Sequence, residues 1–284
     1  MAVVVVTDSS ASLPPGLVAE LEIVVVPLHV LAGDRTIREG IDPIDVDYGS
    51  DDVSTSAASP GELRAVYERA LERSDGAGVV AVHLSQQLSA TWEAGRQAIA
   101  ELGSEHIRLV DSLGAGLATG LPVLAAARRA AAGEGADAVY EGAVAAARRA
   151  RTFILVNRTE QLRKGGRLST AASFFGSELV TKPLLQIVEG RLELREKVRT
   201  RSKAYSRLVA AAVEAAAGEP AAVGVQHLGA AEGAATVVAQ LREQLPDVTE
   251  LVHAEFGPAL AVHLGVGAVG IVVLPGGCRP LSGG

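Results

Sequence analysis

The chain has 284 residues, of which 48% are hydrophobic and 21% charged, a composition typical of a globular protein and not of a disordered one. Its formal net charge of −7 argues against general nucleic-acid binding, and its single cysteine, Cys278, excludes an intrachain disulfide or a cysteine-based metal site. Aromatic residues make up only 3%, so a ligand pocket would be aliphatic, which suits an alkyl chain better than a stacked base or sugar.

Neither a leader peptide nor a membrane span is predicted. The first eight residues are apolar, but they are short and lack a basic leader, so they indicate a first strand. The longest stretch rich in Ala and Leu, residues 117–132, is interrupted by Arg128 and Arg129. We therefore expect a cytoplasmic protein with no stable membrane insertion.

The first half of the chain alternates between strand and helix patterns. The β-branched run at residues 2–7 is typical of a strand buried on both faces, and further strands are expected at 22–30, 78–84 and 107–110. Residues 33–53 show no clear period and are predicted to be a loop. Four helices are expected in this half of the chain. They begin at Pro14-Pro15, at the capping box Ser59-Pro60-Gly61-Glu62, at Ser89 and after Ser112. Alternation of this kind predicts a parallel sheet with ligands at the strand carboxyl ends.

The second half differs in pattern. An Ala-rich helix is expected at 137–151, and Glu189-Gly190 between two short strands indicates a compact hairpin. Further strands are predicted at 153–156, 183–188, 191–195, 221–227, 248–253 and 269–274, with helices between the last three of them. A short helix and basic loop is expected at 159–166, and helices are expected at 169–179 and 201–217. The fold class is therefore α/β, with an N-terminal Rossmann-like parallel-sheet domain at 1–150 and a C-terminal α/β domain with a mixed or antiparallel sheet at 151–284.

Two segments rich in hydroxyl groups are candidate anion sites. Thr55-Ser56 precedes a capped helix, and the segment from His83 to Thr91 lies between a strand and a helix. Hydroxyl groups and free helix amides at such places bind carboxylates or phosphates. Ordinary helix capping is the more common reason for each segment when it is taken alone.

Basic residues gather in one part of the chain. Residues 158–207 contain four Lys and eight Arg against five Glu, a local balance of +7 that leaves −14 for the remainder. The segments Leu162 to Leu168 and Glu196 to Arg201 lie within it, and a histidine followed by glycines comes later, at His263 to Gly270. The uneven charge indicates contact with something anionic, although a solvated basic face has the same composition.

Several enzyme signatures are missing from the sequence. It has no GxGxxG after a predicted strand, no GKS/T phosphate loop, no GxSxG nucleophile elbow and no HExxH metal motif among its six histidines. We therefore expect no cofactor and no metal, and no catalytic residues of the chain's own.

Taken in order, these segments resemble the DegV family. The opening from Thr7 to Pro14 is similar to the start of that family. Thr55-Ser56-Ala57-Ala58-Ser59-Pro60 resembles its TSQPSP segment, and Ser85 to Trp92 resembles SSGLSGTY. Further matches are Val26-Pro27-Leu28, Val110-Asp111-Ser112, Leu162 to Leu168 for LRKGGRI, Lys197 to Thr200 for KVRT, and His263 to Gly270 for HxGPGALG. The sequence departs from these motifs at Ala57, Ala58, Gln86, Gln87, Ala90 and Val266.

The resemblance implies a function. The family includes the fatty-acid-binding subunits of bacterial fatty acid kinase, which would make this chain a non-enzymatic carrier of a long-chain fatty acid. The carrier presents the carboxylate to a separate kinase, which forms an acyl phosphate for phospholipid synthesis. The carboxylate would be held by Thr55 and Ser89, with Ser56 and Thr91 in the same segments. The kinase-related residues would be Arg167, Arg199 and His263.

Two other functions stay open from the sequence. One is a lipid-binding or sensing module with no kinase. The other is a small α/β phosphotransferase or hydrolase, which would need a nucleotide loop or an activated nucleophile.

Overall fold

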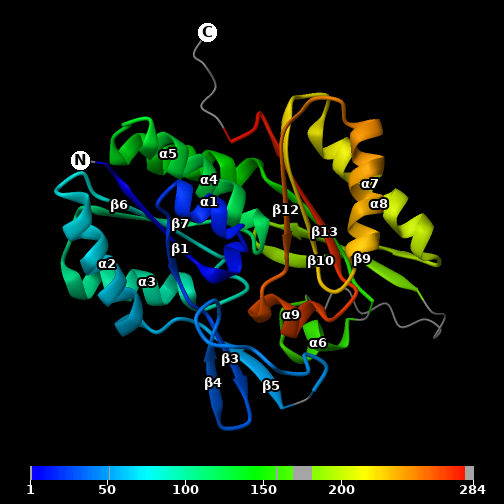
Figure 1. Cartoon of the computed structure of the whole chain (residues 1–284), viewed down its shortest axis with the longest axis horizontal. Helices are drawn as coiled ribbons and strands as arrows, with labels where there is room; N and C mark the ends of the chain where they lie inside the picture. Colours follow the sequence, from blue (N-terminus) through cyan, green and yellow to red (C-terminus); the bar gives the residue numbers. More distant parts are fainter. Residues whose placement is uncertain (1, 51, 158, 169–180, 279–284) are drawn as a thin grey trace.

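The structure is a computed structural model that describes residues 2–50, 52–157, 159–168 and 181–278. Within these residues the strands form three sheets, a parallel sheet of four strands, an antiparallel sheet of three and a mixed sheet of six. Figure 1 shows the parallel sheet with its helices on one side of the molecule and the mixed sheet on the other. The expected fold class is confirmed.

The parallel sheet has the strand order β2-β1-β6-β7. Its strands are β1 (Val4–Asp8), β2 (Val24–Val26), β6 (Val79–His83) and β7 (Ile107–Asp111). Alternate residues of β1 face opposite cores, because Val5 packs with helices α4 (Leu117–Ala131) and α5 (Ala136–Arg149) while Val6 packs with α2 (Pro60–Ser74) and α3 (Thr91–Leu102). Burial on both faces explains why this strand is a continuous β-branched run.

The start of α2 agrees with the sequence prediction. The Ser59 side chain accepts from the Glu62 amide at 3.3 Å, and Glu62 accepts in return from the Ser59 amide at 2.8 Å, so the capping box forms. The short helix α1 (Pro15–Glu20) likewise begins with a proline in its first turn. The polar turn after β1 is a single 3₁₀ turn, η1 (Ser9–Ala11), flanked by Asp8 and Ser12.

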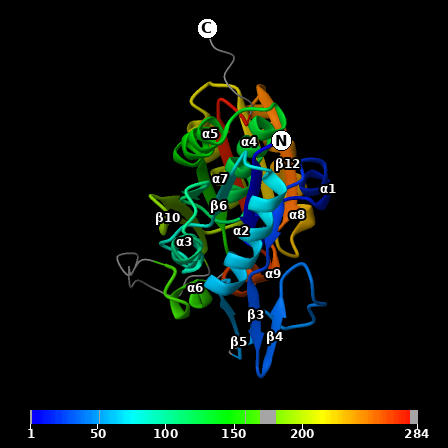
Figure 2. The same ribbon diagram turned by 90° about the vertical axis from the view of Figure 1, so that its left-hand side faces the viewer.

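The small antiparallel sheet was not predicted from the sequence. The region expected to be a loop, residues 33–53, contains β4 (Arg35–Arg38) and the start of β5 (Val53–Ser56), which flank β3 (His29–Ala32) in the order β4-β3-β5. The single strand expected at 22–30 is also wrong, because Pro27 and Leu28 separate β2 from β3. Pro27 has no amide to donate to a ladder, and the chain changes sheet at this point. Figure 2 shows the small sheet projecting from the end of the molecule.

The mixed sheet has the order β10-β9-β8-β13-β11-β12, in which only the β11–β12 pair is parallel. Its strands are β8 (Arg151–Leu155), β9 (Lys182–Val188), β10 (Arg191–Val198), β11 (Ala221–His227), β12 (Val248–Glu255) and β13 (Val269–Pro275). The described helices in this half of the chain are α6 (Glu160–Lys164), α7 (Arg201–Ala216), α8 (Ala231–Gln244) and α9 (Pro258–Leu264). Glu189 and Gly190 both have positive φ and form the predicted hairpin turn. The helix predicted at 169–179 lies outside the described residues.

One of the hydrophobic clusters spans the two large sheets. Helix α4 contacts β1 and β6 of the parallel sheet and also β11 and β13 of the mixed sheet. Its residues pack in a single cluster with Ala222, Val272 and Leu274 from the second half of the chain. The parallel sheet ends before residue 150 and the mixed sheet begins after it. The division into domains at 1–150 and 151–284 stays a prediction.

Candidate functional site

A pocket lies where the small sheet, the parallel sheet and the mixed sheet meet. Five of the residues singled out in the sequence line it, namely Thr55, Ser56, Ser89, Arg167 and His263. They come from β5, from the loop between β6 and α3, from the residues after α6, and from α9. These segments are up to 208 residues apart in the chain, and the folded structure brings them to one place.

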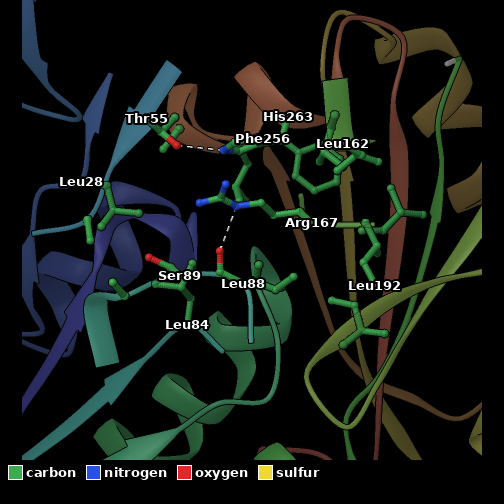
Figure 3. Close-up of a pocket in the computed structure, with 18 of the residues that line it drawn as sticks. Leu28, Thr55, Leu84, Leu88, Ser89, Leu162, Arg167, Leu192, Phe256 and His263 are labelled. Atoms are coloured by element: carbon green, nitrogen blue, oxygen red, sulfur yellow. Dashed lines mark hydrogen bonds between the residues drawn. The ribbon is translucent and has the colours of Figure 1, made fainter. Parts of the chain in front are cut away.

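Thr55 and His263 are in direct contact. Thr55 lies on β5, which pairs with β3, and α9 packs against both strands, so the helix carries His263 to the threonine. The Thr55 Oγ1 atom lies 2.8 Å from His263 Nε2, and Figure 3 shows this hydrogen bond at the edge of the pocket. Burial, assisted by the charge of Arg167, lowers the pKa of His263 to about 4. The imidazole is therefore neutral at pH 7 in this structure.

The neutral state limits what His263 can do as one of the kinase-related residues that the family resemblance implied. A neutral imidazole supplies one hydrogen-bond donor and one acceptor, and it can orient the threonine hydroxyl. It becomes a cation only if a bound anion offsets its burial.

Ser89 approaches the pocket from the opposite side. Its hydroxyl accepts from the Thr91 amide at 3.3 Å and lies 3.0 Å from the Thr91 hydroxyl. Thr91 is fully buried at the start of α3 and does not line the pocket. In this structure Thr91 supports Ser89 and does not face the cavity, so its predicted contact with a carboxylate stays untested. Ser56 lines the pocket beside Thr55 but has an exposed side chain.

Arg167 lies between these two groups. Its Nε atom donates to the Leu88 carbonyl at 3.2 Å, and its Nη1 atom donates to the Gly165 carbonyl. Figure 3 shows the guanidinium between Thr55 and Ser89. A half-buried guanidinium inside an otherwise aliphatic pocket attracts an anionic group to this end.

The structure does not bring Arg199 into this group. Arg199 is exposed directly after β10, just before α7, and it does not line the pocket. Its role in coupling to a kinase stays a prediction, and no contact with the pocket supports it.

The remainder of the pocket is apolar, and these residues were not among the site residues predicted from the sequence. They come from strands of the mixed sheet, from α6 and α9, and from the loops that connect the other elements. They are Leu28, Ala57, Leu84, Leu88, Ala90, Ala115, Ile154, Leu162, Ile187, Leu192, Phe256, Ala259, Leu260 and Leu264. Several of them lie within the motifs found in the sequence, but as apolar side chains they look like any other buried residue, so no local pattern separates them from the core. Ala57 and Ala90, two of the departures from the family motifs, are among them.

The cavity has a volume of about 150 Å³. Its polar groups lie at one end, next to an apolar wall, and this arrangement matches the shape of an amphiphile.

Within residues 2–278, excluding those that the structure does not describe, no cluster of three or more His, Cys, Asp or Glu side chains has the geometry to hold a metal ion. In the described part of the chain, none of the helices has the length and apolar character needed to cross a membrane.

Comparison with known proteins gives a consistent result. The sequence model of the DegV family matches residues 2–276. A DegV domain-containing protein of Mycobacterium tuberculosis is 41% identical over 280 residues, which cover 99% of this chain and 100% of the relative.

Solved structures match over almost the whole chain as well. A DegV family protein from Thermus thermophilus, described as binding fatty acid, has a TM-score of 0.89 at 28% identity and covers 97% of this chain and 100% of its own. DegV of Bacillus subtilis, described as a fatty acid binding protein, has a TM-score of 0.82 at 32% identity and covers 96% and 99%.

Proposed function

Because this chain belongs to the DegV family, we propose that it binds one long-chain fatty acid in the pocket described above and presents its carboxylate to a partner kinase. The observation that carries the binding proposal is the pocket itself, an aliphatic cavity with hydroxyl, imidazole and guanidinium groups gathered at one end. The fatty acid binding described for the relatives from Thermus thermophilus and Bacillus subtilis supports it.

The carboxylate is assigned to the polar end of the pocket. Thr55 and Ser89 supply neutral hydroxyl donors from opposite sides, and Arg167 lies between them. Hydroxyl groups fix the position of a carboxylate without neutralising it, so its oxygens keep their reactivity. The acyl chain then follows the aliphatic wall toward Ile154, Ile187 and Leu192.

In the proposed reaction the chain is the acceptor and carrier. A carboxylate oxygen forms a bond to the terminal phosphorus of ATP, and the bond from that phosphorus to the ADP oxygen breaks. ATP and its magnesium are held by the kinase. Arg167 stabilises the charge on the transferred group, and the exposed Arg199 contacts the kinase. The basic balance of residues 158–207 supports an anionic partner at this surface.

The binding proposal is tested by native mass spectrometry of the purified protein, followed by solvent extraction and identification of bound material. We expect close to one fatty acid per chain. A protein that purifies empty and also refuses added fatty acids contradicts the proposal.

Kinase coupling needs a separate experiment. The loaded protein is mixed with a fatty acid kinase catalytic subunit and ATP, and acyl phosphate is trapped as the hydroxamate. Retained lipid with no acyl phosphate, from a kinase that is active on another carrier, would mean that this chain binds or senses lipid without being phosphorylated.

A further inference from the structure

The polar turn after β1 lies directly behind the pocket, and the proposed chemistry does not use it. Asp8, the last residue of β1, is fully buried at the start of this turn. Its carboxyl group accepts from the Leu84 amide at 3.0 Å and from His83 Nδ1 at 2.9 Å, and it also accepts from Ser10. Leu84 lines the pocket and begins the loop that carries Ser89. Asp8 therefore fixes the start of that loop.

The same network reaches the far end of the loop through Tyr67. The Tyr67 hydroxyl is hydrogen-bonded to His83 Nε2 at 2.7 Å, and both side chains are fully buried. A Cβ atom at Gly95 would lie only 2.7 Å from that hydroxyl, so α3 packs closely on the pair. Because α3 begins at Thr91, the tyrosine and histidine also set where the loop ends and thus where Ser89 lies.

A second branch of the network holds two more pocket-lining residues. The Leu28 amide donates to Ser9 Oγ at 2.9 Å, and the Ser9 hydroxyl donates to Glu39. The Glu39 carboxyl group, itself buried, accepts from the Ala259 amide at 3.3 Å. Leu28 and Ala259 both line the cavity. Three stretches of the pocket wall are thus held by their backbone amides from behind.

We propose that this buried network is a positioning device for the ligand site, in which Asp8, His83 and Tyr67 hold the Ser89 loop in its binding geometry. None of the three lines the pocket, so they act on the ligand only through the loop. A contact group is held accurately when its support is locked by buried hydrogen bonds, and a loosened support weakens binding without removing any ligand contact. The inference rests on the proposed function, since it assigns Ser89 to the ligand.

The experiment compares substitutions that remove or change one hydrogen-bonding group each. Asp8→Asn and Tyr67→Phe alter the network, and Thr7→Val is the matched control. Thr7 is also fully buried on β1 and donates to the Val82 carbonyl at 2.8 Å, but it holds no part of the pocket wall. For each delipidated protein, the dissociation constant for a 16-carbon saturated fatty acid, the melting temperature, and amide hydrogen exchange across residues 84–90 are measured.

The affinity for fatty acid and the loop exchange should separate the network variants from the control. We expect Asp8→Asn to weaken binding about tenfold or more, Tyr67→Phe to weaken it less, and both to speed exchange across residues 84–90. Thr7→Val should keep wild-type affinity and loop exchange at a comparable loss of melting temperature. Equal affinity in wild type and Asp8→Asn overturns the inference, as does an equal loss in Thr7→Val.

Failure of the proposed function is recognised separately. If the wild type itself binds no fatty acid, the exchange data alone decide. Faster exchange at residues 84–90 in Asp8→Asn than in Thr7→Val then supports the positioning role, and equal exchange overturns it.

Discussion

Replacing Thr55 by valine is the most direct test of the proposed carboxylate site. Valine has the shape of threonine and suits a strand, so β5 and the pocket volume should be preserved. The change removes the hydroxyl that lies 2.8 Å from His263 Nε2 and that we assign to the carboxylate. A hydrogen bond to a charged group contributes roughly 1.5–3 kcal/mol, so the dissociation constant for fatty acid should rise roughly tenfold to a hundredfold.

A stability effect accompanies this loss of affinity. His263 loses its threonine partner in a mostly buried setting, which costs about 1 kcal/mol of folding free energy at the lower end for an unsatisfied group. Both quantities can be measured, the affinity by titration of delipidated protein and the stability by urea unfolding at pH 7. Thr55→Ser restores the hydroxyl and should recover most of the affinity.

The matched control lies on the same strand. Ser54 is exposed and does not line the pocket, so Ser54→Val removes a hydroxyl from β5 without touching the site. If Thr55→Val binds fatty acid as tightly as wild type and Ser54→Val, the carboxylate does not lie at Thr55 and the reasoning is refuted.

Three further predictions follow from single contacts. The pKa of His263 is lowered to about 4 from its ordinary 6.5, so its contribution to stability is complete above pH 6.5 and is lost as the pH falls toward 4. Between pH 7 and 4.5 the unfolding free energy of His263→Gln should therefore fall less than that of the wild type, by about 3 kcal/mol at most. An equal fall in the two proteins would contradict the assignment. Arg199→Ala should keep bound lipid in native mass spectrometry but reduce acyl phosphate formation, whereas an emptied pocket would show that Arg199 serves binding. Gly190→Ala should lower the melting temperature more than Gly218→Ala; both glycines have φ near +80°, but only at Gly190 does a Cβ meet a side chain, the hydroxyl of Ser85.

The elements predicted correctly are those with strong local signals. The β-branched run of β1, the capping box at Ser59 and the hairpin turn at Glu189-Gly190 each specify their structure through neighbouring residues. The small sheet lacked such a signal. In β4 only Ile37 of four residues is buried, so the pattern shows no period that marks a strand. Its strands exist because they pair with each other and, through β3 and β5, pack against α9.

By itself the sequence determined the family, the α/β class and the segments that carry the polar site residues, because ordered motifs and local propensities are properties of short stretches of chain. Tertiary structure alone decided that Thr55 and His263 touch across 208 residues, that Thr91 lies behind Ser89, and that Arg199 lies away from the pocket. It also decided which leucines line the cavity and which fill the core. The physical reason is that a pocket is space left between elements, and its position and charge depend on how distant segments pack, which no local pattern contains.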